Sequence, residues 1–364
     1  MLIYFLNIAM DRLDKIKRSF DEIGIDSFLI KKLPNIRYIS GFSGSAASIL
    51  LTKEKNYFIT DFRYKTQSKS EVKGDFEIII FAQNSLNFIK DLKIKENFKK
   101  TGFESNFLTY SEAEILKKDF PDVKFIPVDS LIENIVSVKN ENEIELTKKA
   151  VEITDKTFLE LLKIIKPGMT EREVSAEISY HHKKFGADGD SFDCIVAAGE
   201  HSAFPHARPT DRKIGNNELL KLDFGCTVQG MKSDLTRTIA LGKVSDECKK
   251  IYEIVKEAQK KALDIIKAGM STKQIDSVAR NYIREKGYGD NFGHGLGHGL
   301  GYDIHEKPFL NERADYILEE GNLITVEPGI YIEGVGGVRI EDDVLVKKDG
   351  IEILNKAPKD FIEL

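Results

Sequence analysis

The stretch IIKPGMTEREVSAEI at residues 164–178 returns as IIKAGMSTKQIDSVA at residues 265–279. In both copies a helix ends at a Gly, and the next helix begins at Thr or Ser with Glu or Gln three residues further on, which is capping-box spacing. An internal repeat of this kind indicates that the second part of the chain is built from two similar halves. Later residues keep the same order, because His206 follows the first copy and His305 follows the second.

Each copy then continues into an expected β-hairpin that carries two acidic residues. In LLKLDFGCTVQGMKSDLTRTIAL, Asp223 and Asp234 lie at equal distances from a turn at residues 228–229. In LITVEPGIYIEGVGGVRIEDDVLV, Glu327 and Glu341 lie at equal distances from the central Gly of the segment. Residues equidistant from a hairpin turn face one another across the strands, with Cβ atoms about 5 Å apart. The spacing therefore predicts two pairs of opposed carboxylates.

Opposed carboxylates on apolar strands repel each other unless a cation lies between them. Two like charges about 4 Å apart repel by about 4 kcal/mol at an effective dielectric constant near 20, and Asp is depleted from strands. In another register the acids would face solvent, but the arrangement occurs in both copies of the repeat. If the two hairpins converge, their carboxylates would balance two divalent cations. An oxygen-rich site without thiolates favours Mn²⁺ or a similar metal over structural zinc.

A Gly-rich segment, FGHGLGHGLGYDIHE at residues 292–306, contains three of the seven histidines of the chain: His294, His298 and His305. His294 and His298 have the spacing of a zinc-protease helix, but the glycines disfavour a long helix and the glutamate of H-E-x-x-H is absent. Alternation along a strand fits better, because Gly allows the backbone to approach a metal or substrate closely. We expect this segment to complete the metal site with one imidazole.

Residues 1–135 are expected to form a small α/β domain and residues 136–364 a second domain. The first region alternates the strand patterns DSFLI, ASILLT, NYFIT and FEIIIF with helical patterns such as SEAEILKKDF, where Ser111 and Glu114 have capping-box spacing. No His occurs in this region, so imidazole chemistry must come from the second one. The boundary falls where PVDSLIENIVSVKNENEIE passes from a strand to a new helix near Asn140.

Composition limits the partners of the chain. A net charge of −5 gives no general attraction to nucleic acid or anionic lipid. The three cysteines are odd in number and lack C-x-x-C spacing, which is typical of a reducing compartment, and we expect them to be buried. The opening MLIYFLNIAM lacks a basic region and a cleavage site and is too short to span a bilayer. We expect a cytoplasmic protein that starts at Met1, or at Met10, where an amphipathic helix begins.

The ordered residues Asp223, Asp234, His298, Glu327 and Glu341 resemble the dinuclear metal site of the pita-bread metallopeptidases. That family includes methionine aminopeptidase, aminopeptidase P and prolidase. FPHARPTDR, LDFG, SDLTRT, GHGLGHGLG, DIHE, VEPGIY and GGVRIEDD resemble its catalytic domain, and PNIRYISGFSGSAASILLT and FITDFRY resemble the N-terminal domain of its Xaa-Pro branch. The resemblance implies an α/β (α+β) fold in which a C-terminal pita-bread domain has an internal pseudo-two-fold repeat.

The same resemblance assigns a metal-binding role to each of these five residues. Asp223 would bind one ion through both oxygens, while Asp234 and Glu341 would bridge two ions. His298 and Glu327 would hold the second ion. The implied cofactors are two divalent metal ions per chain, most plausibly Mn²⁺, with Co²⁺, Fe²⁺ and Zn²⁺ as alternatives. A water activated between the ions would attack the carbonyl that precedes proline.

Other residues are assigned to the substrate. The resemblance implies that Glu327 passes a proton to the leaving nitrogen and that His206 and His305 stabilise the tetrahedral intermediate through hydrogen bonds. His294 and Arg339 would support the metal and the substrate, although Arg339 could equally act as an outer partner of the acidic cluster.

Two residues depart from the family pattern. Tyr302 stands where Leu is usual, and it would either line the pocket or pack in the core. His201 stands where a small polar residue is usual, and we expect it to be an exposed loop residue.

The Xaa-Pro substrate class that the resemblance implies has a physical reason. The bond before proline is a tertiary amide without an N–H, so its hydrolysis needs a pocket shaped for the ring. We expect a homodimeric Xaa-Pro aminopeptidase acting on Xaa-Pro peptides. The alternative is an Xaa-Pro dipeptidase (prolidase), which must also bind the proline carboxylate. Methionine aminopeptidase is disfavoured by the N-terminal domain, and a metal-free creatinase-like or binding-only protein by the intact ligand set.

Overall fold

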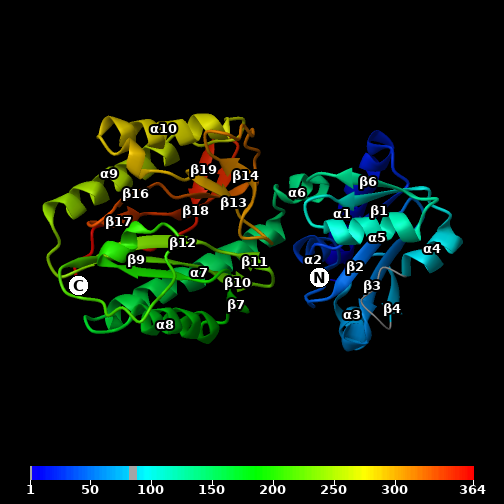
Figure 1. The fold of residues 1–364 in the computed structure, drawn as a ribbon, viewed down its shortest axis with the longest axis horizontal. Helices are drawn as coiled ribbons and strands as arrows, with labels where there is room; N and C mark the ends of the chain where they lie inside the picture. The colour runs from blue at the N-terminus through cyan, green and yellow to red at the C-terminus, as the bar shows by residue number, and fades with distance from the viewer. Residues whose placement is uncertain (1, 82–87) are drawn as a thin grey trace. The chain divides into compact units, whose positions relative to one another are not determined.

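The computed structural model of the chain describes residues 2–81 and 88–364 and divides the chain into two compact units, Met1–Val136 and Ser137–Leu364. Both units mix helices and strands (Figure 1), which confirms the expected α/β class. The three cysteines, Cys194, Cys226 and Cys248, are buried and unbridged as expected.

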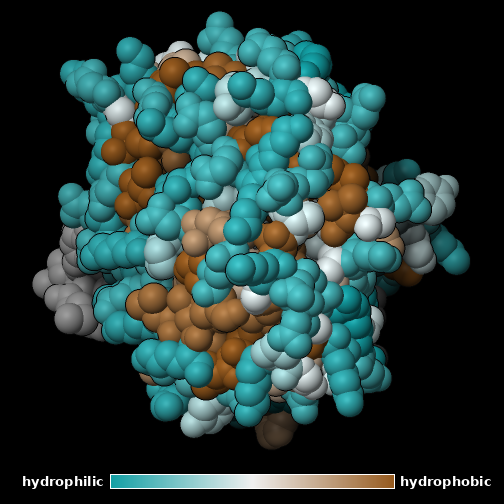
Figure 2. Space-filling model, turned by 90° about the vertical axis from the view of Figure 1, so that its left-hand side faces the viewer, coloured by the Kyte–Doolittle hydropathy of each residue, from teal (hydrophilic) through white to brown (hydrophobic). Residues whose placement is uncertain are grey.

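The surface of the second unit drawn in Figure 2 is mainly hydrophilic, with hydrophobic areas between the polar side chains. Of the helices in the described ranges, none is long and apolar enough to cross a membrane.

The first unit is built around one mixed sheet of six strands in the order β4-β3-β2-β1-β5-β6 (Figure 1). The strands are β1 (Ser27–Ile30), β2 (Ala47–Thr52), β3 (Asn56–Asp61), β4 (Glu77–Phe81), β5 (Lys100–Glu104) and β6 (Lys124–Val128). The helices are α1 (Leu2–Ile23), α2 (Leu33–Ser40), α3 (Lys65–Glu71), α4 (Phe88–Glu96), α5 (Tyr110–Asp119) and α6 (Leu131–Val136), with the 3₁₀ turn η1 (Phe62–Tyr64). The four strand patterns noted in the sequence are therefore confirmed as β1 to β4.

Two local predictions for this unit are wrong. Helix α1 begins at Leu2, so the amphipathic pattern that starts at Met10 is the continuation of a longer helix. Helix α5 is capped by Thr109 and Glu112, which bond reciprocally, rather than by Ser111. Ser111 is the second residue of the helix, because Thr109 is the last extended residue and the helix begins at Tyr110.

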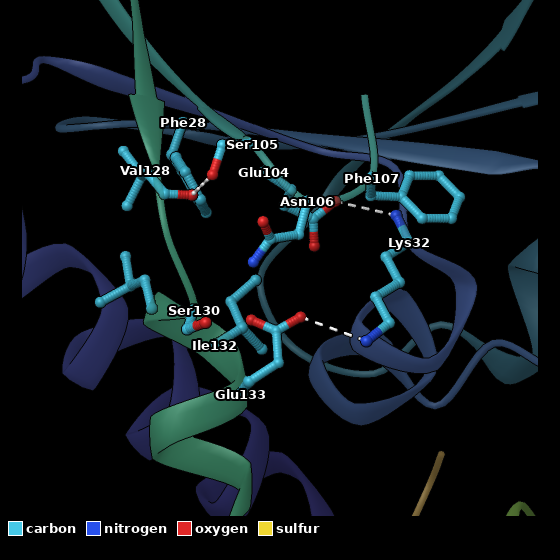
Figure 3. A pocket seen from close by; sticks show the side chains of 11 residues that line it. Phe28, Lys32, Glu104, Ser105, Asn106, Phe107, Val128, Ser130, Ile132 and Glu133 are labelled. Carbon is cyan, nitrogen blue, oxygen red and sulfur yellow. Dashed lines mark hydrogen bonds and ion pairs between the residues drawn. The ribbon is translucent and has the colours of Figure 1, made fainter. Parts of the chain in front are cut away.

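A small cavity of about 60 Å³ lies beside the carboxyl end of β5 (Figure 3). Glu104 is buried there and accepts hydrogen bonds from the backbone N–H groups of Lys31 and Lys32 at 2.7 and 2.9 Å and from Asn35 Nδ2 at 2.6 Å. Glu133 accepts from Lys32 Nζ at 3.3 Å and from Asn35 Nδ2 at 3.0 Å. Because these donors surround the two carboxylates, the cluster ties β1, α2, β5 and α6 together within the unit.

The second unit places its strands between two pairs of helices (Figure 1), which is the expected pita-bread arrangement. The helices are α7 (Glu141–Ile164), α8 (Glu171–Lys184), α9 (Asp246–Leu263) and α10 (Thr272–Glu285), with the 3₁₀ turns η2 (Gly199–Ala203) and η3 (Gly289–Asn291). The strands of the first half are β7 (Gly189–Asp190), β8 (Ile195–Ala198), β9 (Glu218–Phe224), β10 (Cys226–Val228), β11 (Met231–Lys232) and β12 (Leu235–Leu241). Those of the second half are β13 (Gly297–Gly299), β14 (Glu306–Leu310), β15 (Leu323–Val326), β16 (Gly329–Ile332), β17 (Gly336–Arg339), β18 (Asp342–Lys347) and β19 (Gly350–Ile353).

The sequence repeat corresponds to the two helix pairs. Gly168 and Gly269 follow α7 and α9 with φ angles of +95° and +84°, which an L side chain rarely adopts. Thr170 then caps α8 in a capping box with Glu173, and Ser271 caps α10 by accepting from the backbone N–H of Gln274 at 3.4 Å. The predicted order of helix, Gly and capped helix is thus confirmed in both halves, and α7 begins after Asn140 as expected.

The register of the first hairpin differs from the prediction. Val228 pairs with Met231, so the turn lies at Gln229–Gly230, and both turn residues have positive φ angles, of 48° and 94°. Asp223 is therefore opposite Thr236, and Asp234 lies in the short break between β11 and β12. A two-residue hairpin turn of this kind needs two residues at positive φ, and Gly at the second position supplies one of them at no steric cost.

The register of the second hairpin is confirmed. Val326 pairs with Asp342 on one side of the predicted pair, and Gly329 pairs with Arg339 on the other. Glu327 and Glu341 occupy the interval between these two ladders, at the equal distances from the turn that the sequence indicated.

Candidate metal centre

Residues from three separate segments meet in the middle of the second unit. Asp234 from the first hairpin, His298 from β13 and Glu341 from the second hairpin are buried, and one potential ligand atom of each lies within 4.8 Å of the others. His298 Nε2 is 3.7 Å from an Asp234 carboxylate oxygen and 3.4 Å from Glu327 Oε1. Four of the five sequence-predicted metal ligands are therefore neighbours.

The fifth, Asp223, is joined to this group through Arg339. The guanidinium of Arg339 forms a hydrogen-bonded ion pair with Asp223, and its Nε lies 3.8 Å from Glu327 Oε2. Arg339 also donates to Tyr331 Oη at 2.8 Å. Arg339 therefore contacts two residues of the acidic cluster, Asp223 and Glu327.

The hydrogen bonds of His298 identify which ring nitrogen faces the carboxylates. Nδ1 lies 3.0 Å from the carbonyl oxygen of Gly299, so Nδ1 carries the proton and Nε2 presents its lone pair to the acidic side chains. Burial, together with the neighbouring His305, lowers the pKa of His298 to about 3. A neutral imidazole with a free lone pair is the form of His that binds metal ions.

The carboxylates lack the partners that a buried charge requires. Burial raises the pKa of Asp234 and of Glu341 well above their usual values, and the nearby carboxylates raise them further. Asp234 Oδ1 and Glu341 Oε1 are buried without a hydrogen-bond donor among the described residues. Oxygen atoms of this kind beside a neutral imidazole fit a hard divalent cation, which would supply the missing positive charge.

The side chain of Glu327 is bonded to Thr325, a residue of β15. Thr325 Oγ1 donates to Glu327 Oε1 at 3.3 Å. Burial raises the pKa of Glu327 to about 7, although Arg339 counteracts this. In the absence of a cation, Glu327 is therefore partly protonated near neutral pH.

The backbones on either side of the cluster are fixed by further polar contacts. Asp343 Oδ2 accepts a hydrogen bond from the backbone N–H of Asp234 at 2.9 Å, and Thr236 Oγ1 donates to Glu341 Oε2 at 2.6 Å. These bonds join the two hairpins, because each pair takes one residue from either hairpin. A backbone N–H and a hydroxyl group of the first hairpin are therefore bonded to carboxylates of the second.

The remaining predicted histidines lie around the cluster. The ring of His305 packs edge-on against the ring of His298 with centroids 4.4 Å apart, and its side chain is solvent-accessible. His206 is exposed on the loop after η2, and it is one of the groups that lower the pKa of His305 and of His294, after the larger effect of burial. The matched histidines of the repeat thus face the same region.

His294 belongs to a chain of hydrogen bonds rather than to the ligand group, and it precedes β13 instead of lying on it. Its Nε2 accepts from Tyr331 Oη at 2.9 Å, while its Nδ1 lies 2.8 Å from the Gly295 carbonyl oxygen. Because Tyr331 Oη also accepts from Arg339, the chain runs from His294 through Tyr331 and Arg339 to Asp223. Sequence reasoning missed Tyr331, whose only signal was its place in the segment VEPGIY.

Tyr302 and His201, which depart from the family pattern, both lie in defined surroundings. Tyr302 is half-buried against an apolar cluster with Leu300 and Leu323, so it packs in the core. The prediction of an exposed His201 is wrong. Its side chain is 16% exposed, and Nδ1 lies 2.8 Å from the fully buried carboxylate of Glu171, which no sequence pattern connected to it.

A buried ion pair supports the segment that carries His305. Lys139, just after the start of the unit, contacts the carboxylate of Glu306, and both side chains are almost completely buried. A Cβ on Gly301 would lie 2.4 Å from Glu306 Oε1 and 2.7 Å from Lys139 Cε, so a larger residue here would force the ion pair to shift. The pair fixes the residue next to His305.

The fold and the ligand set define a metallopeptidase, and comparison with known sequences agrees. The sequence model "Metallopeptidase family M24" matches residues 145–348, and "Creatinase/Prolidase N-terminal domain" matches residues 12–135. The chain belongs to metallopeptidase family M24 and is therefore a hydrolase of the peptidase class.

Proteins similar to this chain include Xaa-Pro dipeptidases and an X-Pro aminopeptidase. An Xaa-Pro dipeptidase of Pyrococcus horikoshii is 40% identical over 98% of this chain and 100% of its own. The structure of an Xaa-Pro dipeptidase from Bacillus anthracis superposes with a TM-score of 0.94 at 43% identity, covering 98% of this chain and 100% of that one. The structure of an X-Pro aminopeptidase from Thermotoga maritima gives a TM-score of 0.90 at 40% identity, covering 97% and 99%.

Proposed function

We propose that this chain is an Xaa-Pro dipeptidase that hydrolyses the bond before proline in dipeptides. The full-length similarity to the Pyrococcus horikoshii and Bacillus anthracis dipeptidases carries this proposal. It replaces the sequence-based preference for an aminopeptidase. Xaa-Pro aminopeptidase activity is the second candidate, because the Thermotoga maritima protein is similar over nearly the same length.

The proposed cofactor is a pair of divalent metal ions, with Mn²⁺ as the first choice because the ligands are mostly carboxylates. The residues that would hold them are Asp223, Asp234, His298, Glu327 and Glu341. The unpartnered oxygens of Asp234 and Glu341 and the free lone pair of His298 support this assignment. When bound, the metals would polarise the substrate carbonyl and bring the pKa of a water molecule close to neutrality.

The side chains around the cluster have proposed roles in handling the substrate. His206 and His305 would donate hydrogen bonds to the oxygen of the carbonyl under attack, where negative charge develops. Glu327 would carry a proton to the proline nitrogen, which must be protonated to leave as an amine. Arg339 would hold Asp223 in place, and His294 would hold Arg339 through Tyr331, as their hydrogen bonds suggest.

Two further expectations from the sequence stay predictions. The chain is expected to act as a homodimer, which sedimentation of the purified protein would test. A cytoplasmic location is likewise expected, without nucleic-acid or membrane partners.

The test of the function compares two substrates that differ by one residue. Purified chain reconstituted with Mn²⁺ is assayed with Ala-Pro and with Ala-Pro-Ala, and Asp234→Ala serves as the inactive control. The expected result is a much higher kcat/KM for Ala-Pro than for Ala-Pro-Ala. Cleavage of Ala-Pro-Ala at an equal or higher kcat/KM would favour the aminopeptidase, and cleavage of neither would contradict both proposals.

A further inference from the structure

Lys221 is a fully buried lysine in β9, two residues before Asp223. Alternation along the strand puts both side chains on the same face of the sheet. Among the described residues no carboxylate forms an ion pair with Lys221. A buried amine is costly unless its donors are satisfied, so its hydrogen bonds indicate what it does.

The partners of Lys221 are all backbone carbonyls of one loop. Nζ donates to the carbonyl oxygens of Ser202 at 3.0 Å, Phe204 at 2.7 Å and Pro205 at 3.5 Å. The same amine lies 4.9 Å from the centre of the Tyr331 ring. Three carbonyls within four residues can converge on one atom only if the loop turns around it. Lys221 therefore determines the path of residues 202–205.

This loop ends at His206. Its residues make further hydrogen bonds. The backbone N–H of Gly337 donates to Ser202 Oγ at 2.8 Å, the backbone N–H of Phe204 donates to the His201 carbonyl oxygen at 3.1 Å, and Arg339 Nη1 donates to the Pro205 carbonyl oxygen at 3.1 Å. Phe204 is 59% exposed and offers little packing. Without the amine, the carbonyl oxygen of the buried Ser202 would lose a donor, and the loop would have to move to satisfy it.

We propose that Lys221 is a positioning residue that fixes the loop of residues 202–205 and so places His206 against the substrate. This inference rests on the proposed role of His206. A charged and a neutral amine both donate hydrogen bonds, so the role does not depend on the protonation of Lys221. Displacement of an oxyanion-stabilising group by about 1 Å can cost about a hundredfold in rate.

The test replaces the amine by an apolar group of similar length. Lys221→Met is expected to lower kcat by about ten- to a hundredfold with little change in KM, and to bind as much Mn²⁺ as the wild type. Lys156→Met is the matched control, because Lys156 is an exposed lysine that pairs with Glu152 on the surface of α7. The kcat of this variant should equal that of the wild type.

A double variant separates positioning from a general structural effect. If Lys221 acts through His206, then Lys221→Met should cause no further loss of kcat in a His206→Ala background. Three results would each overturn the proposal: a further loss of kcat in the double variant, an unchanged kcat in Lys221→Met, or a loss of bound metal from Lys221→Met. If Lys221→Met does not fold, Lys221→Gln, whose amide still donates, is used for the same cycle.

The crystal structures of the wild type and Lys221→Met give a readout that does not require activity. His206 is expected to be displaced and the loop of residues 202–205 rearranged. An unmoved loop would overturn the inference. If the wild type cleaves no Xaa-Pro substrate, the proposed function fails, but this structural comparison still decides whether Lys221 positions the loop.

Discussion

Glu327→Gln is expected to stabilise the metal-free chain at neutral and alkaline pH. Burial raises the pKa of Glu327 from 4.5 to about 7. Because the folded pKa is the higher one, the folded chain retains a proton that the unfolded chain releases between these pH values. Stability is therefore lost as pH rises from 4.5 to 7, and the loss is complete above 7.

The size of the effect follows from the two pKa values. They correspond to a loss of about 1 kcal/mol at pH 5 and about 3 kcal/mol at pH 8 in the free energy of unfolding. Gln has no charge to bury, and its carbonyl oxygen can still accept the hydrogen bond from Thr325. The metal-free variant should therefore exceed the wild type by these amounts, which corresponds to a rise of about 1 M in the urea midpoint at pH 8.

The assay is urea unfolding in EDTA at both pH values, followed by circular dichroism and repeated after addition of Mn²⁺. Glu320→Gln, in the exposed turn before β15, is the control and should not change the midpoint. With Mn²⁺ the order should reverse, because a neutral amide is a poorer ligand than a carboxylate. An equal or lower midpoint for metal-free Glu327→Gln at pH 8 would refute the reasoning.

Two further substitutions separate metal binding from turnover. Asp234→Ala should lose both metal ions and at least about a thousandfold in kcat, since Asp234 in its proposed role would serve both ions. Metal analysis after dialysis together with the Ala-Pro assay measures this, and full activity would contradict the ligand assignment. His305→Ala should keep the metal content and lose about a hundredfold in kcat. The reason is that the His305 ring touches His298 but is accessible to substrate. Retention of wild-type kcat would exclude the role of His305 at the carbonyl.

Several features of the site could be predicted from local sequence. The repeat of helix, Gly and capping residue determines the two-fold plan, because each signal acts within a few residues. The register of the second hairpin could also be predicted, since Glu327 and Glu341 are symmetric about Gly334 and Gly334 adopts the positive φ of 75° that its turn needs. The first hairpin was placed one residue off, because its turn conformation depends on Gln229 taking a positive φ, which is uncommon for a non-Gly residue.

The sequence by itself thus determined the fold class, the order of the acidic residues and the histidine that faces them, because these depend on short-range spacing. Only the tertiary structure decided which groups touch. Three contacts join residues from different elements: Arg339 with Asp223, His201 with Glu171, and Lys221 with the carbonyls before His206. A buried polar atom bonds to whichever partner the packing of the whole unit brings within reach, and local patterns carry no record of that distance.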